Sequence, residues 1–135
     1  MALEATLLLE GKYYDIQELS YQITKPYGNN FKPSANAVGG VINFTILSPM
    51  DGNLVFHEWV TSIAEVKKGT FFLPLTHGIK HTVKEISFEN AHCVSLHEQY
   101  SNTSSKQMFI ALAICAPLIK FSETVEFRNR ELPEK

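Results

Sequence analysis

Apolar and polar residues alternate with a period of two along most of this chain, which predicts β-strands. In the first such segment Leu7 and Leu9 share one face and alternate with Thr6 and Glu10. Further alternating segments cover residues 42–47, 71–75, 82–88, 91–100, 107–116 and 119–127. Because most of these segments follow one another as hairpins, we expect a mostly β fold, an antiparallel β-barrel of about eight strands.

The alternation changes phase inside the second predicted strand. Its apolar residues are first at even positions, Tyr14 and Ile16, and then at odd positions, Leu19 and Tyr21. One extra residue in a strand produces such a change and bends the strand. The pattern therefore predicts a bulge or bend near residues 17–18.

One segment has the period of a helix. Its apolar residues recur at i, i+3, i+4 and i+7, namely Phe56, Trp59, Val60 and Ile63. Ser48 or Asp51 is a suitable N-cap, and residues 67–69, Lys-Lys-Gly, suit a C-terminus. We therefore expect one α-helix over residues 51–66, packed on the side of the barrel.

Residues 25–40 have the composition of a long exposed loop, with two prolines, three glycines and three asparagines. Loops of this length are uncommon in compact domains and are often functional. An idle loop would expose its two aromatic residues to water, although a merely tolerated surface loop is the alternative. We interpret residues 25–40 as an arm that contacts a partner, with candidate contact residues Tyr27, Asn29, Asn30, Phe31 and Lys32.

The predicted strand over residues 108–115 is apolar on both faces. One face is large (Met108, Ile110, Leu112, Ile114) and the other is small (Ala111, Ala113, Cys115). A barrel strand needs only one apolar face, so the small face is expected to be covered, either by the helix or by another subunit. Ala111, Ala113 and Cys115 are therefore candidate interface residues.

Composition limits the possible partners. The 135 residues fit a single domain over 1–135, with a charged tail expected to fray over 128–135. A net charge of −2 and scattered lysines argue against nucleic acid as a partner. No apolar run reaches the ~20 residues of a membrane span, so membrane insertion is not expected. The N-terminal residues lack the basic region of a signal peptide, which predicts synthesis in the cytoplasm.

Candidate catalytic and cofactor-binding residues do not form a recognisable site. The chain lacks GxxxxGK[ST], GxGxxG and GxSxG motifs. His77 and His81 would lie ~13 Å apart in a strand, and His92 and His97 have opposite parity, which predicts that they point to opposite faces. We expect no enzyme activity, no cofactor and no metal. Cys93 and Cys115 are expected to be buried free thiols, in preference to a disulfide or a reactive thiol.

Three stretches, in order, carry a resemblance to a known family. GGVINFTILSPMDGNLVFHEW follows the arm, FENAHCVSLHEQYS comes later, and the apolar strand MFIALAICA follows it. Together they resemble the Hcp (TssD) tube proteins of type VI secretion systems, in the version found in Bacteroidetes. The similarity covers residues 2–127.

This resemblance implies a structural function. Six copies would form a ring with a wide central channel, and rings would stack into a tube driven outward by a contractile sheath. The implied partners are copies of the chain itself, sheath and spike components, and effector proteins carried in the lumen. The tube would assemble in the cytoplasm and then be secreted.

Two other functions are compatible with a small barrel. One is a small-ligand or glycan-binding protein, which would keep an apolar cavity and stay monomeric or dimeric. The other is an enzyme whose histidine and carboxylate side chains converge in one pocket. Oligomeric state and the content of the barrel interior distinguish these alternatives from a tube subunit.

Overall fold

The fold consists of eight β-strands and one short α-helix in the described part of a computed structural model. The structure describes residues 4–25, 28–32, 39–49, 51–100, 108–122 and 125–128, apart from the side chains of His77 and His81. In chain order the elements are β1 (Thr6–Leu9), β2 (Lys12–Tyr21), β3 (Val41–Leu47), α1 (Val55–Thr61), β4 (Lys67–His77), β5 (Lys80–Glu98), β6 (Phe109–Cys115), β7 (Leu118–Phe121) and β8 (Val125–Arg128).

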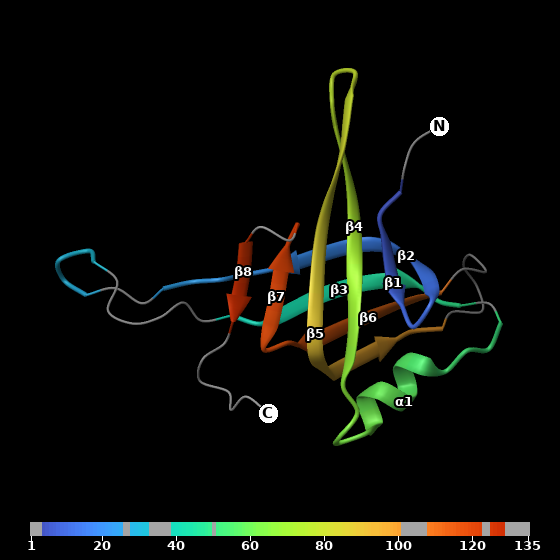
Figure 1. The fold of residues 1–135 in the computed structure, drawn as a ribbon. Helices are drawn as coiled ribbons and strands as arrows, with labels where there is room; N and C mark the ends of the chain where they lie inside the picture. The colour runs from blue at the N-terminus through green and yellow to red at the C-terminus, as the bar shows by residue number, and fades with distance from the viewer. Residues whose placement is uncertain are drawn as a thin grey trace.

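The predicted antiparallel barrel is confirmed. Strands follow one another in the order β4-β1-β2-β3-β6-β5, and the pairing of β4 with β5 closes the sheet on itself. Strands β7 and β8 continue outward from β5 and lie outside the closed barrel (Figure 1). The expectation of one strand over residues 119–127 was wrong, because the chain turns after Phe121 and pairs back on itself as β7 and β8.

Inward-facing side chains fill the barrel. The most deeply buried include Leu7, Leu9, Ile42, Ile46, Phe71, Ile86, Phe88, Ile110 and Ile114. They occupy alternate positions of their strands, as the period of two requires. The predicted bulge in β2 is also confirmed, because the register between β2 and β3 shifts between Ile16 and Glu18.

Helix α1 is much shorter than predicted. It covers Val55–Thr61, whereas the apolar periodicity indicated residues 51–66. Its first free N–H, on Val55, donates to Asn53 Oδ1 at 3.0 Å, so Asn53 replaces Ser48 and Asp51 as the polar residue at the N-terminus. Ser62 already has an extended backbone, and Ile63 is 95% exposed instead of continuing the apolar stripe.

Residues 67–69 begin β4 and do not cap the helix. A Cβ at Gly69 would lie 2.9 Å from Leu8 O and 2.9 Å from Phe88 Cζ. Glycine is therefore required for the close approach of β4 to β1. No helix in the described ranges is long and apolar enough to span a membrane.

Two aromatic side chains attach α1 to the barrel. Phe56 and Trp59 are buried, and Trp59 Nε1 donates to Ala91 O at 3.1 Å. The Trp59 ring stacks near Phe88, with centroids 6.4 Å apart, and Phe56 meets Tyr14 edge-on at 5.0 Å. Because Phe88 and Tyr14 face the barrel interior, α1 completes the core as well as covering β5.

A buried lysine joins the start of β4 to the β1–β2 turn. Lys67 Nζ lies 2.6 Å from Glu65 Oε2 and 2.9 Å from Glu10 Oε1. Burial by itself lowers the pKa of Lys67, but the hydrogen bonds to Glu65 and Glu10 raise it more, and the net pKa is above the usual value. The ammonium therefore stays charged in the fold, since both carboxylates compensate its desolvation.

Replacement of Trp59 tests the attachment of α1. We expect Trp59→Ala to lower the free energy of unfolding by about 3–5 kcal/mol, because it creates a cavity and leaves Ala91 O without its donor. Denaturant titration followed by circular dichroism measures the change. Ile63→Ala, at an exposed position just after the same helix, should change stability by less than about 0.5 kcal/mol. Equal effects of the two variants would contradict this attachment.

Candidate functional site

The described part of the predicted arm includes a tight turn over residues 28–32. Phe31 N donates to Gly28 O at 3.0 Å, and Gly28 N donates to Lys32 O at 3.2 Å. Asn30 Oδ1 accepts from Lys32 N at 3.1 Å. Phe31 has a φ of +62°, rare for a bulky residue, and its side chain is 84% exposed. The turn therefore presents an aromatic ring to solvent.

Four predicted arm residues lie in this turn: Asn29, Asn30, Phe31 and Lys32. All four are exposed. Tyr27 and residues 33–38 lie outside the described residues. The turn projects well away from the barrel beyond β2 (Figure 1). Its position suits a contact with another molecule, and that contact stays a prediction.

The small face of β6 points outward. Ile110, Leu112 and Ile114 are buried in the barrel, so the alternate residues Ala111, Ala113 and Cys115 face away from it. Helix α1 packs against β5 and leaves this face uncovered, because Ala111 is exposed and Ala113 and Cys115 are only partly buried. Of the two covers that the sequence left open, the helix is therefore excluded.

Cross-strand register places polar residues on both sides of the two alanines. One row across β2, β3, β6 and β5 is Ser20, Asn43, Ala113 and Ser95. The next row is Glu18, Thr45, Ala111 and His97. We call these eight residues the polar face. The small face of β6 is thus a narrow strip in a polar surface, not the centre of an apolar patch.

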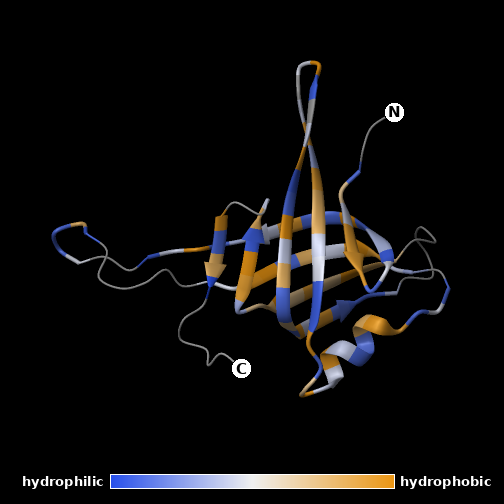
Figure 2. Ribbon diagram, viewed as in Figure 1, coloured by the Kyte–Doolittle hydropathy of each residue, from blue (hydrophilic) through white to orange (hydrophobic). Residues whose placement is uncertain are grey.

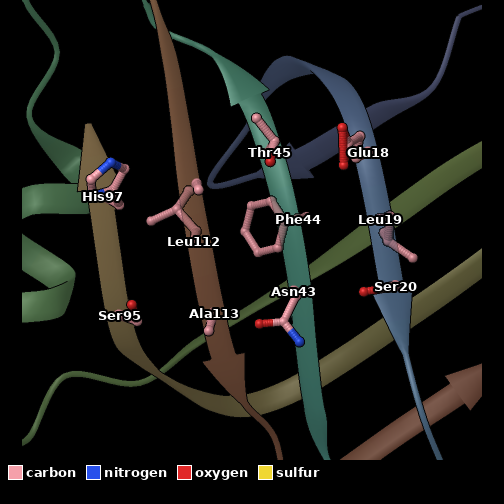
Figure 3. A pocket seen from close by; sticks show the side chains of 11 residues that line it. Glu18, Leu19, Ser20, Asn43, Phe44, Thr45, Ser95, His97, Leu112 and Ala113 are labelled. Carbon is pink, nitrogen blue, oxygen red and sulfur yellow. The ribbon is translucent and has the colours of Figure 1, made fainter. Parts of the chain in front are cut away.

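The polar face is hollowed. A depression of about 230 Å³ lies over the alanines, with Glu18 and Ser20 on one side and Ser95 and His97 on the other (Figure 3). The methyl groups of Ala111 and Ala113 leave this space because their neighbours on the adjacent strands have longer side chains. Among the described residues, no group of three His, Cys, Asp or Glu side chains could hold a metal ion.

His92 and His97 both face outward, so the prediction that they point to opposite faces was wrong. The register between β5 and β6 shifts between Cys93 and Ser95. This irregularity inserts one residue at Val94 and reverses the parity of the later residues in β5. As a result His92 lies opposite Cys115, and His97 lies opposite Ala111.

The arm and the small face of β6 are not brought together in one copy. The arm follows β2 and extends away from the barrel (Figure 1), while Ala113 lies in the middle of the polar face (Figure 3), next to Ala111 on the same side of β6. Two separate candidate surfaces suit a subunit that forms heterologous contacts, in which different surfaces of two copies meet.

Sequence reasoning missed a polar connection between α1 and the strand ends. Glu98 Oε1 lies 3.3 Å from His57 Nε2, and Ser48 Oγ donates to Glu98 Oε2 at 3.4 Å. Since these residues are 41 and 50 positions apart, no local spacing indicates the cluster. It holds α1 against the end of β5.

The two cysteines are free, and they lie on opposite faces of the sheet. In the register of β5 and β6, Cys93 lies opposite the inward-facing Ile114, whereas Cys115 lies opposite the outward-facing His92. Burial raises the pKa of the Cys93 thiol, although a backbone hydrogen bond with Ser95 partly opposes this. Cys115 is only partly buried. The two thiols therefore differ in accessibility.

Thiol labelling tests this arrangement. In the folded monomer at neutral pH we expect a maleimide to modify Cys115 and to leave Cys93 largely unmodified, because only the thiolate reacts and Cys93 is buried. Mass spectrometry of digested protein identifies the modified cysteine. Both should react in denaturant. Faster modification of Cys93 than of Cys115 in the native protein would contradict the register of β5 and β6.

Comparison with known proteins gives one family. The model of the family "Hemolysin coregulated protein Hcp (TssD)" matches residues 1–130. Hcp1 from Flavobacterium johnsoniae is similar in structure, with 24% identity, a TM-score of 0.76, and coverage of 94% of this chain and 100% of that one. Hcp1 from E. coli EAEC 042 has 11% identity, a TM-score of 0.69, and coverage of 93% and 97%.

A more distant likeness extends to other injection machines. A chain in the sheath-tube complex of an extracellular contractile injection system, PVC, has 16% identity and a TM-score of 0.53, and 88% of each chain is covered. No curated protein matches the chain.

Proposed function

Because this chain belongs to the Hcp (TssD) family, the tube proteins of type VI secretion systems, we propose that six copies close into a ring and that rings stack into a tube. In this proposal the tube assembles in the cytoplasm, associates with sheath and spike components, and is secreted with effector proteins in its channel. The chain acts by assembly and catalyses no reaction.

The observation that carries this proposal is the distribution of apolar and polar side chains. In the described part of the chain, the barrel interior is filled by large buried side chains such as Phe44, Phe71 and Phe88. This filling argues against a ligand-binding barrel, which would keep an apolar cavity. Exposed apolar side chains lie on the outside of the molecule, among them Tyr13 on the barrel wall and Phe31 on the arm, whose apolar tip Figure 2 shows. Function on the outside of a filled barrel is what a structural subunit requires.

The polar face suits the wall of the channel. A channel that passes other proteins must not bind them through a large apolar patch. The two rows consist of short, mostly uncharged polar side chains around Ala111 and Ala113. A tightly packed subunit contact would instead have an apolar centre. We therefore place the polar face on the channel side of the ring.

The arm suits the contact that joins one copy to the next. Its described turn presents Phe31 to solvent at a distance from the barrel, where another copy could bury the ring. The modest net charge of −2 also allows many copies to pack without strong mutual repulsion.

Deletion of residues 29–37 tests the arm. We expect the barrel to fold with nearly unchanged thermal stability, because the described residues within this deletion, 29–32, are exposed and are not part of the core cluster. Ring or tube assembly should be weakened, as measured by light scattering after size exclusion and by negative-stain microscopy. Unfolding of the variant would show that the arm belongs to the core, and unchanged assembly would remove its proposed function.

Ala113→Glu tests which way the polar face points. On a channel wall the new carboxylate stays in water, so the variant should form rings of the same mass as the wild type. Asn43→Glu, in the same cross-strand row, should behave alike. At a packed subunit contact each carboxylate would be buried without a partner, and rings should be lost. Loss of rings with both variants would therefore favour the subunit contact that the sequence predicted for Ala111, Ala113 and Cys115.

A further inference from the structure

The β4–β5 hairpin continues far beyond the barrel as a two-stranded ribbon. β1 pairs with β4 only as far as Phe72, and β7 pairs with β5 only from Ile86. Residues 73–84 therefore pair only with one another, and both edges of this segment are open in the described structure. Figure 1 shows the ribbon leaving the barrel at the end opposite α1, in a different direction from the arm.

The ribbon exposes apolar side chains at its tip. Ile79, which forms the two-residue turn with Gly78, is 95% exposed, and Leu75 and Val83 are 52% and 43% exposed. Gly78 has a φ of +64°, which suits a tight hairpin turn and keeps Ile79 at the outermost point. The apolar tip is also visible in Figure 2. A hairpin needs only a polar turn here, so the apolar tip indicates a contact.

An isolated two-stranded ribbon is marginally stable in water and gains from support by another surface. Its base is held by Lys84, whose Nζ donates to Tyr21 OH at 3.3 Å and lies 5.9 Å from the centre of the Tyr21 ring. Pro74 removes one backbone donor from β4, which hinders the addition of a further strand. Contact through side chains is therefore favoured over strand addition.

The charge of the ribbon is opposite to that of the rest of the chain. Residues 73–84 contain Lys80 and Lys84 and no carboxylate. Since the whole chain has a net charge of −2, the remainder carries −4. This difference favours another copy of the same chain as the partner of the ribbon.

One exposed surface of the barrel combines apolar and acidic groups. On the outward side of β1, β2 and β4, Tyr13 is 66% exposed and its ring lies 6.4 Å from that of Phe72. Leu8 pairs with Tyr13, and Asp15 lies two residues further along the same side of β2. We call Leu8, Tyr13, Asp15 and Phe72 the aromatic patch. It offers apolar contact for Ile79 and a carboxylate for Lys80.

We propose that the β4–β5 ribbon of one copy docks on the aromatic patch of the next copy. The inference rests on the proposed function, because it requires the chain to assemble with itself. It adds a second contact to that of the arm. Ribbon and patch are different surfaces of one molecule, so the contact is heterologous and can repeat around a ring or along a stack.

Two ribbon variants test the docking, together with wild-type protein. Ile79→Asp puts a charge at the tip. Replacement of residues 76–81 by Asn-Gly removes the tip, and the new two-residue turn connects Leu75 directly to its strand partner Thr82. Both should keep the wild-type melting temperature within a few degrees. Both should raise the concentration needed for half-assembly about tenfold or more, as measured by light scattering and negative-stain microscopy.

The matched control is Ile63→Asp, which places the same charge at an equally exposed isoleucine outside the ribbon. It should assemble like the wild type. A charge exchange then tests the patch: Lys80→Glu and Asp15→Lys should each weaken assembly, and the double variant should restore it. Microscopy also shows whether rings, or only their stacking, are lost in the ribbon variants.

Wild-type assembly by both ribbon variants would overturn the proposal, as would equal loss with Ile63→Asp. Loss without rescue by the charge exchange would overturn the patch as the docking surface. If the wild-type chain itself stays monomeric at high concentration, the proposed function fails, and this result is distinct from failure of the ribbon alone.

Discussion

Closure of the sheet by the pairing of β4 with β5 is the constraint that determines the other features. Once the six strands form a closed barrel, the alternate residues of every strand must face one enclosed interior. Large apolar side chains fill that interior, and α1 completes it with Phe56 and Trp59. The opposite residues are then left to face outward, where they are available for assembly.

The closed barrel also explains why β4 and β5 are so long. The part of β4 up to Phe72 pairs with β1, and the part of β5 from Ile86 pairs with β6 and β7. Only residues 73–84 extend beyond the sheet as the ribbon. The arm extends from the barrel in another direction (Figure 1). A rigid, filled body with two projecting segments can reach neighbouring copies without any change in its own core. Assembly and folding are therefore largely separate properties of this chain.

Much of the fold could be predicted because alternation reports burial directly. The bulge in β2 was predictable because two apolar residues on each side of it revealed the change of phase. The irregularity at Val94 was not, since Val94 is apolar but exposed and hides the shift. The helix was predicted too long because Ile63 matches the apolar stripe in sequence, yet the backbone at Ser62 is already extended.

The candidate surfaces were predictable only in part, for a related physical reason. Local pattern identified the arm and the small face of β6, because both are contiguous in sequence. The polar face depends on the register of four strands, and the aromatic patch depends on that of three. The ribbon depends on where the neighbouring strands end. None of these is encoded in a single segment.

A ring of copies whose channel is lined by the polar face would join the filled barrel, the arm and the ribbon into one assembly. Electron cryomicroscopy of the purified, assembled protein would show this arrangement directly. We expect rings of six copies with Asn43 and Ala113 on the channel wall and the arm in contact with another copy. A monomer that does not assemble at high concentration, or a ring in which the polar face is buried between subunits, would contradict this arrangement.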